Sequence, residues 1–153
     1  MRVEAGASAG ETIAVTGSSG RLGRAVVDDL LAHDFRVVGI DRIEAHPSHR
    51  DRLTRHHRWV DASVETPEGV GSVVALSDQL QGCTALVHLA AFPSPEGRPA
   101  EMVFVNNTVA TFVALEAAGQ IGITRAAIAS SGSAYGTAFS PEPTHPSYVP
   151  VDE

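Results

Sequence analysis

Short apolar runs rich in β-branched residues alternate along most of this chain with longer segments that are apolar on one side only. A short apolar run bounded by turn residues is typical of a parallel strand buried on both faces. Apolar residues spaced three and four apart indicate a helix that packs by one face. Strands are predicted at 12–16, 36–40, 57–60, 85–90 and 125–131. Helices are predicted at 21–33, 67–80 and 99–118.

Strands that alternate with helices in this way pair in parallel through right-handed crossovers. We therefore expect an α/β fold, a Rossmann-type doubly wound parallel sheet of about five strands in the order 3-2-1-4-5. Ligands of such sheets bind beyond the carboxyl ends of the strands, at the switch point between strands 1 and 4. The residues that carry function should lie just after each strand.

The rest of the chain differs in composition from these elements. Residues 1–11 are small and polar and are predicted to form a flexible tail. Residues 12–136 are predicted to form a dinucleotide-binding Rossmann domain, and residues 137–153 a proline-rich loop. A length of 153 residues fits one domain, and an apolar fraction of 43% supports a packed core.

Charge and cysteine content narrow the function classes. A net charge of −7 argues against a nucleic-acid partner, because surfaces that bind nucleic acid are normally basic. The single cysteine, Cys83, excludes an intrachain disulfide and a cysteine-rich zinc site. No apolar run that we predict approaches the roughly 20 residues of a membrane span, and residues 1–11 lack the apolar stretch of a signal peptide. We expect a cytoplasmic protein without a membrane partner.

A histidine-rich stretch between the second and third strands contains His46, His49, His56 and His57. Four arginines lie among these histidines. Because neighbouring cations disfavour a metal ion, we interpret the stretch as a solvated loop and expect no metal site.

Three glycines between the first strand and the first helix follow the pattern G-x-x-G-x-x-G. One glycine allows a sharp turn, one lets the backbone approach a pyrophosphate, and one lets the helix pack closely on the strand. The helix N-terminus offers N–H groups and a positive dipole end to the phosphates. An ordinary strand–helix turn is the alternative. The predicted cradle residues are Gly17, Ser19, Gly20, Arg21, Leu22 and Gly23.

Asp41 ends the second strand, 24 positions after Gly17, close to the spacing of about 20 expected for an acid that binds the adenosine ribose. Its carboxylate can accept hydrogen bonds from both ribose hydroxyls of NAD and would repel the 2′-phosphate of NADP. NAD is therefore the expected cofactor, with NADP second. Arg42 either accommodates that phosphate or is a solvated surface charge.

Six segments together resemble the extended short-chain dehydrogenase/reductase family, in its NAD-dependent epimerase/dehydratase group. The resemblance covers about residues 12 to 153. The six segments are residues 16–23, Asp41, Asp61, residues 88–91, Asn107 with residues 115–118, and residues 130–136.

The resemblance implies further roles at the cofactor. Asp61, with Ala62 beside it, would bind the adenine amino group, and Asn107 would brace the active site through backbone contacts. A floor of small residues would lie under the adenosine ribose and the pyrophosphate. Its residues are Leu89, Ala90 and Ala91. The alternatives are a solvated acid for Asp61, a local cap for Asn107 and plain core packing for the alanines.

The resemblance also places Ser130 at the nicotinamide and aligns Ser131 with the catalytic Ser/Thr that contacts the reacting hydroxyl or carbonyl. The family's acid–base pair is a tyrosine with a lysine four positions later. All 11 basic residues of this chain are arginine, Tyr135 is followed by Phe139, and Tyr148 is followed by Asp152. We therefore expect the N-terminal portion of a longer enzyme, truncated before the substrate lobe and inactive alone.

The parent enzyme is expected to be a homodimer that transfers a hydride at a hydroxyl of a sugar, sugar acid or nucleotide sugar. The alternative hypothesis is a non-catalytic NAD(P)-binding or redox-sensing module that uses the same cradle without chemistry.

Overall fold

The computed structural model describes residues 10–58, 73–94, 96–132 and 142. Its centre is a five-stranded parallel sheet in the order β3-β2-β1-β4-β5, which confirms the predicted fold class. The strands are β1 (Thr12–Thr16), β2 (Arg36–Asp41), β3 (Arg55–Arg58), β4 (Ala85–His88) and β5 (Ala126–Ile128). The helices are α1 (Arg21–Ala32), α2 (Val73–Gln79) and α3 (Ala100–Gln120).

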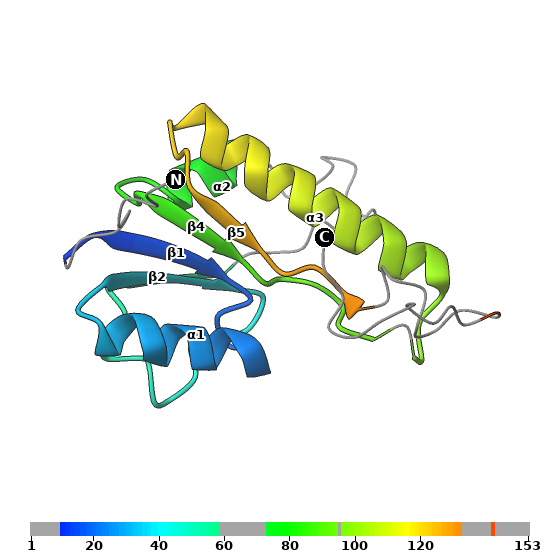
Figure 1. Ribbon diagram of the computed structural model, residues 1–153, viewed down its shortest axis with the longest axis horizontal. Helices are drawn as coiled ribbons and strands as arrows, with labels where there is room; N and C mark the ends of the chain where they lie inside the picture. The colour runs from blue at the N-terminus through cyan, green and yellow to red at the C-terminus, as the bar shows by residue number, and fades with distance from the viewer. Residues whose placement is uncertain (1–9, 59–72, 95, 133–141, 143–153) are drawn as a thin grey trace, which may run out of the picture.

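The helices cover the sheet from both sides, with α1 on one face and α2 and α3 on the other (Figure 1). Successive residues of β1 serve opposite faces, because side chains alternate along a strand. Ala14 packs into the core beneath α2 and α3, whereas Val15 packs with Val27 of α1. The continuous apolar run of β1 is therefore explained by two cores that share one sheet.

β1 is the switch point of the sheet. It pairs with β2 on one side, where Thr16 lies opposite Ile40, and with β4 on the other, where Thr16 lies opposite His88. The chain therefore winds outward in one direction through β2 and β3 and in the other through β4 and β5. The carboxyl ends of β1 and β4 meet at this point, so a crevice between the following loops is expected there.

Three strands differ from the sequence-based prediction by two residues or more, and β2 extends one residue beyond its predicted end, to Asp41. β3 was predicted at 57–60 and is described at 55–58, because pairing with β2 begins at Arg55, opposite Val38. β4 ends at His88 instead of residue 90, since the next two backbone N–H groups bond to Thr16. β5 covers 126–128 of the predicted 125–131. Residues 59–72 and most of the predicted tail lie outside the described residues.

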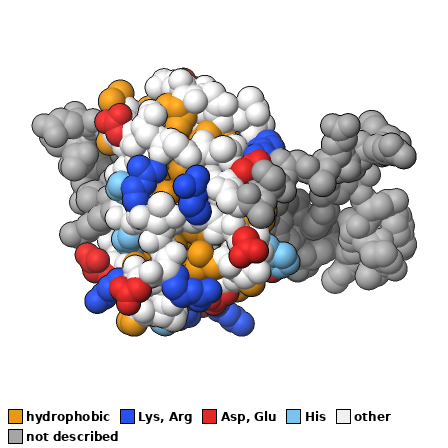
Figure 2. Space-filling model, turned by 90° about the vertical axis from the view of Figure 1, so that its left-hand side faces the viewer, with side chains coloured by type: hydrophobic (Ala, Val, Ile, Leu, Met, Phe, Trp, Pro, Cys, Tyr) orange, Lys and Arg blue, Asp and Glu red, His pale blue; other side chains and the backbone are white. Residues whose placement is uncertain are grey.

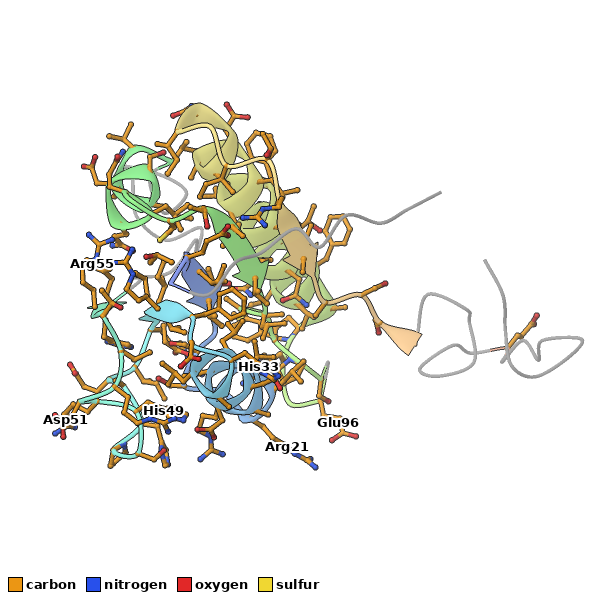
Figure 3. The ribbon with its side chains drawn as sticks, turned by 60° about the vertical axis from the view of Figure 1, so that its left-hand side comes forward. Arg21, His33, His49, Asp51, Arg55 and Glu96 are labelled. Atoms are coloured by element: carbon orange, nitrogen blue, oxygen red, sulfur yellow. The ribbon has the colours of Figure 1, made fainter. Side chains whose placement is uncertain are left out.

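The interpretation of the histidine-rich stretch as fully solvated was wrong for His49. Its side chain is only 2% exposed, and its Nε2 lies 3.0 Å from Oδ1 of Asp28 on α1. Arg52 binds the same carboxylate oxygen at 3.1 Å. The hydrogen bond from His49 is the main cause that lowers the pKa of Asp28. This triad ties the segment after β2 to α1, and Figure 3 shows His49 beside that helix.

The longest helix corrects another expectation. By length and composition alone, the 21 residues of α3 suffice to cross a membrane, although we predicted no apolar run near that length. One face of α3 is buried against α2 and the sheet. The buried residues are Ala110, Val113, Ala114, Ala117 and Ala118. That face makes α3 part of the folded core, although most residues of its apolar stretch lie outside the buried face.

The edge of the sheet where the strands begin carries charges of both signs (Figure 2). Arg36 opens β2 and donates to the carbonyl of Gly10, and Arg125, just before β5, pairs with Glu11. Opposite charges are thus interspersed at this edge, in contrast to the carboxyl edge described next.

Candidate cofactor site

The fold itself demands glycine at two of the three positions in the cradle. Gly17 has φ of +69°, donates to the carbonyl of Ile40 at 2.8 Å, and a Cβ on it would lie 2.8 Å from the backbone of residues 89 and 90. A Cβ on Gly23 would lie 2.0 Å from the carbonyl oxygen of Gly17. Both positions are closed to any side chain by neighbouring backbone.

Gly20 differs from the other two glycines. Its φ of −70° suits any residue, and a Cβ on it would meet only the carbonyl oxygen of Gly17, at 3.1 Å. Gly20 is the N-cap of α1, and no side chain caps the helix there. The N-terminus of α1 therefore lies at the groove that Gly20 lines, and it has no side-chain cap. This arrangement fits an anion at the helix N-terminus.

Asp41 is buried at the end of β2 and both of its carboxylate oxygens are engaged. Oδ2 accepts from the backbone N–H of Ser19 at 2.9 Å, and Oδ1 accepts from the N–H of Ile43 at 3.2 Å. Each oxygen retains a further lone pair for a ligand hydroxyl. The carboxylate therefore joins the glycine segment to the loop after β2 and is held in place from two sides.

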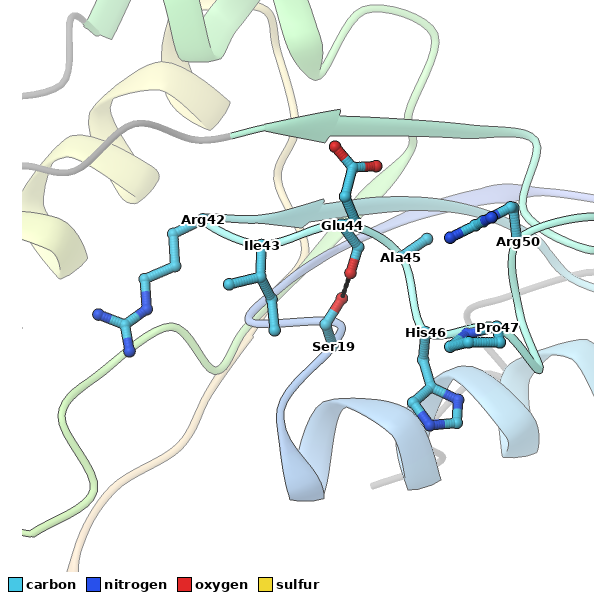
Figure 4. Close-up of a pocket in the computed structure, with 8 residues that line it drawn as sticks. All are labelled: Ser19, Arg42, Ile43, Glu44, Ala45, His46, Pro47 and Arg50. Carbon is cyan, nitrogen blue, oxygen red and sulfur yellow. Dashed lines mark hydrogen bonds between the residues drawn. The ribbon is translucent and has the colours of Figure 1, made fainter.

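A second cavity, of about 600 Å³, lies along the loop after β2. Ser19 closes one of its walls by donating from its Oγ to the carbonyl of Glu44 at 3.0 Å (Figure 4). The other lining residues are Arg42, Ile43, Ala45, His46, Pro47 and Arg50. The side chain of Arg42 points away from the rest of this group in Figure 4, toward the loop after β4.

A buried pair of side chains, Thr16 and His88, joins β1 to β4 at the switch point. Thr16 Oγ1 accepts from the N–H groups of Leu89 and Ala90 at 3.2 and 3.3 Å, and it lies 2.8 Å from His88 Nδ1. Because Oγ1 already accepts two hydrogen bonds, we infer that the Thr16 hydroxyl donates its proton to Nδ1 of His88. The proton of the neutral imidazole ring then lies on Nε2. Burial lowers the pKa of His88 to about 4, which keeps the ring neutral.

Asn107 of α3 holds the loop that follows β4. Its Oδ1 accepts from the N–H of Phe92 at 2.8 Å, and its Nδ2 donates to the carbonyl of Phe92 at 3.1 Å. Asn106 donates to the same Oδ1 at 3.0 Å. One amide side chain thus satisfies both backbone groups of a loop residue and fixes the loop to a long, packed helix.

These loops surround a groove of about 970 Å³ at the carboxyl ends of the strands. The groove brings together predicted residues that are far apart along the chain. Those that line it are Gly17, Gly20, Arg21, Leu22, Gly23, Asp41, Arg42, Leu89, Ala90, Ala91, Asn107, Ser130 and Ser131. Ser19 lines the neighbouring cavity instead, and Asp61 and Ala62 lie outside the described residues.

Sequence reasoning missed several residues of the groove. Thr16 and His88 were not predicted as a pair, and neither Phe92 nor Arg98 was singled out, although both line the groove. The sequence offered a weak signal for Arg98, as the one basic residue between the fourth strand and the long helix.

Known proteins with similar sequences are dehydrogenases and reductases. A NAD-dependent glucose-6-phosphate dehydrogenase from Haloferax volcanii is 28% identical over 148 residues, which cover 94% of this chain and 52% of the relative. A putative dihydroflavonol 4-reductase from Synechocystis is 30% identical over 80% of this chain and 33% of its own length. The chain thus spans about half of the first relative and a third of the second.

Similar folds occur in solved structures that contain NAD. A short-chain dehydrogenase/reductase superfamily protein from Agrobacterium tumefaciens with bound NAD is 34% identical, with a TM-score of 0.64 over 92% of this chain and 37% of that one. MoeE5 in complex with UDP-glucuronic acid and NAD is 30% identical, with a TM-score of 0.66 over 84% of this chain and 39% of that one. The family model for NAD-dependent epimerases and dehydratases matches residues 13–151. The chain therefore belongs to the NAD-dependent epimerase/dehydratase family, whose cofactor is NAD.

Proposed function

We propose that this chain supplies the cofactor-binding half of a NAD-dependent oxidoreductase or epimerase that transfers a hydride at a hydroxyl of a sugar, sugar acid or nucleotide sugar. One observation carries the proposal. Gly20 lines the groove as the N-cap of α1 and no side chain caps the helix there, so that the α1 N-terminus is left to an anion in the groove. In this reading residues 12–136 are the dinucleotide-binding domain, residues 1–11 a tail and residues 137–153 a loop toward a catalytic segment.

In this proposal each loop at the carboxyl edge binds a different part of the dinucleotide. The N–H groups at the start of α1 bind the pyrophosphate, and Asp41 accepts hydrogen bonds from the ribose hydroxyls. The backbone of Leu89 and Ala90, fixed by Thr16, forms the floor with Ala91. Asp61, with Ala62 beside it, is assigned to the adenine.

The nicotinamide end is assigned to the loop after β5. NAD accepts or returns the hydride at its nicotinamide ring. Ser130 would contact that ring, and Ser131 would hydrogen-bond the reacting hydroxyl; both line the groove. The sequence contains no lysine, so it cannot form the tyrosine–lysine pair that moves the proton in this family. We infer that the chain by itself binds NAD and does not turn over.

The sugar-type substrate is proposed from the relatives. MoeE5 was solved with UDP-glucuronic acid and with UDP-glucose, and the Haloferax relative is a glucose-6-phosphate dehydrogenase. All three ligands or substrates named there are sugars or nucleotide sugars that carry an acid or phosphate group. A homodimer of the parent enzyme is proposed as well, with the exposed apolar side of α3 as the surface to test.

A second proposed function, a non-catalytic module that senses the redox state of NAD, is supported only by the absence of lysine from the sequence. A module that binds NAD and senses its redox state needs the cradle and Asp41 but no proton carrier. Turnover after addition of a separate catalytic segment would decide for the enzyme.

The first experiment compares NADH with NADPH by fluorescence titration or calorimetry. NADH should bind more tightly, because the fixed carboxylate of Asp41 would repel a 2′-phosphate. Equal or tighter binding of NADPH would contradict the assignment of Asp41 and transfer the role to Arg42.

The second experiment tests the cradle through Gly20→Val. The new side chain should occupy the pyrophosphate position and weaken NADH binding by well over tenfold, which corresponds to more than about 1.4 kcal/mol. Gly119→Val is the control for adding a branched side chain away from the groove, because a Cβ on Gly119, in α3, meets nothing within 4 Å. Unchanged NADH binding by a folded Gly20→Val variant would place the phosphates elsewhere.

A further inference from the structure

The backbone of Phe92 is held in place at the edge of the groove. Asn107 binds both backbone groups of Phe92, and Asn107 itself belongs to α3, which is packed on the sheet. The residue is half-buried and lines the groove. Its ring therefore extends from a fixed backbone and offers an aromatic face beside the carboxyl ends of β1 and β4.

Two arginines from different loops meet at this ring. The guanidinium carbon of Arg98 lies 4.5 Å from the ring centroid, and that of Arg42 lies 6.0 Å from it. Arg42 follows β2, on one side of the switch point, and Arg98 precedes α3, on the other. Both distances are within the range of cation–π attraction. The ring thus gathers two like charges that would otherwise repel each other.

The charge of the groove is strongly unbalanced. Among the described residues that line it, Asp41 is the sole acid, against Arg21, Arg42 and Arg98. Asp41 already accepts two backbone hydrogen bonds, and the described side chains include no ion pair between it and Arg42. Glu96, from the loop that carries Arg98, projects outward in Figure 3. The lining of the groove therefore has a net positive charge, which favours an anionic ligand.

We propose that Arg42 and Arg98, held by Phe92, form a clasp that binds the diphosphate of the dinucleotide from the side opposite the α1 N-terminus. The inference rests on the proposed function and adds two specific ligands to it. A guanidinium group presents paired N–H donors whose geometry matches two phosphate oxygens. The face of Phe92 holds the groups ready without placing them against Asp41, so less side-chain freedom is lost when the anion arrives.

The location of the clasp favours the diphosphate over two other anions. A 2′-phosphate would lie beside the ribose, in reach of Arg42, Arg50 and His46 in the neighbouring cavity, and would not need Arg98. An acidic sugar would lie near Ser130 and Ser131, beyond β5. Arg42 and Arg98 meet at one ring, and Arg42 is next to Asp41. This position suits the diphosphate, which lies between the ribose and the far end of the groove.

The test uses Arg98→Gln and Arg42→Gln, with Arg36→Gln as the matched control. Arg36 opens β2 at the opposite edge of the sheet and is exposed, as Arg42 and Arg98 are, so its replacement changes net charge without touching the groove. Dissociation constants for NADH, ADP and 2′-AMP are measured by calorimetry at low and high salt. Loss of either clasp arginine should weaken NADH and ADP binding by about tenfold, and the control should not. The salt dependence of ADP binding should fall in the same variants.

Phe92→Leu tests the role of the ring separately, since it keeps apolar bulk and removes the aromatic face. It should weaken ADP binding several-fold. Arg98→Gln should weaken ADP binding by a smaller factor in the Phe92→Leu variant than in the wild-type chain. Unchanged ADP binding by Arg98→Gln would overturn the clasp, as would a loss confined to 2′-AMP or NADPH. Failure of the wild-type chain to bind NADH would instead overturn the proposed function itself.

Discussion

The two sides of the switch point differ in how completely they bury their own surfaces. On the β2 side, five of the six residues of β2 are buried, and the loop that follows is tied to α1 through His49 and Asp28. On the β4 side, all three residues of β5 are exposed. Large apolar side chains are also exposed along α3. They are Met102, Phe104, Phe112 and Leu115. The side that we assign to the adenosine, called the closed side below, also exposes two large apolar side chains, Leu22 and Ile43. The side that we assign to the nicotinamide, called the open side, exposes more of them.

This difference separates the residues that we assign to cofactor binding from those that we assign to the reaction. Gly20, Asp41 and the α1 N-terminus all lie on the closed side or at the switch point, so a cofactor can be recognised by one compact unit. Ser130 and Ser131, the residues that we assign to the reaction, lie after an exposed strand. Precise placement of a reacting group requires neighbours that lock it, and the strand that leads to these serines is exposed along its whole length.

The largest effect expected from this contrast is on catalysis. The chain, supplied with NAD and sugars, sugar phosphates, nucleotide sugars or uronic acids, should show no measurable formation of NADH. General acid–base catalysis typically contributes about 10²- to 10⁴-fold, and Ser131 cannot replace a tyrosine–lysine pair, since a serine hydroxyl is a poor base at neutral pH. Absorbance at the NADH band checks this result, with NADH binding as the control for a folded site. Robust turnover would show that the open side is catalytically complete.

A smaller effect concerns the seam between the two sides, where His88 bonds to Thr16. Its pKa of about 4 in the folded chain compares with 6.5 for an ordinary histidine. Between these pH values the unfolded chain binds a proton that the folded chain does not. The free energy of unfolding should therefore fall as pH drops from 6.5 to 4, by up to about 3 kcal/mol, and this group should cause no change above pH 6.5.

The variant His88→Asn should flatten that decline, because the amide oxygen can still accept from Thr16 and does not titrate. Part of the slope should persist, since burial, and then the nearby charge of Arg55, also lower the pKa of His57. The exposed His33, changed to Asn, is the control. Denaturant unfolding between pH 4 and 7 provides the measurement, and an equal slope in wild type and His88→Asn would contradict the assignment.

The sequence predicted the closed side better than the seam, for a physical reason. β1 was placed correctly and α1 to within one residue, because an apolar run that stops at glycine and a helical spacing after it are both local signals. β3 was misplaced by two residues, since its residues Arg55–Arg58 are all charged or histidine and its position is set by pairing with β2.

Contacts across the switch point could not be predicted in the same way. Thr16 and His88 lie 72 positions apart, and their hydrogen bond depends on the register of β1 against β4. The meeting of Arg42 with Phe92 likewise depends on how two loops are oriented above the sheet. Gly20 and Asp41 were accessible to sequence reasoning because their spacing along the chain is itself the signal.

The smallest effect on stability is expected from changes to the exposed side of α3. These changes also test most directly whether the open side is an exposed apolar surface. Phe104 and Phe112 are 69% and 62% exposed, and their spacing of eight residues places them on one side of the helix, with Thr108 between them. Exposed apolar stripes of this kind promote association, and a helix can pack such a stripe against the same stripe of a second copy. We expect the chain to self-associate through this side.

The double variant Phe104→Gln/Phe112→Gln should abolish self-association in sedimentation and light-scattering measurements. Its free energy of unfolding should change by less than about 0.5 kcal/mol, as is usual for exposed positions. Val74→Gln on α2 is the matched control, because Val74 is 66% exposed but lies outside the stripe. A monodisperse wild-type monomer would contradict the expectation. A loss of several kcal/mol in the double variant would mean that the stripe is covered within one chain, by residues beyond those that the structure describes, and that the open side is closed after all.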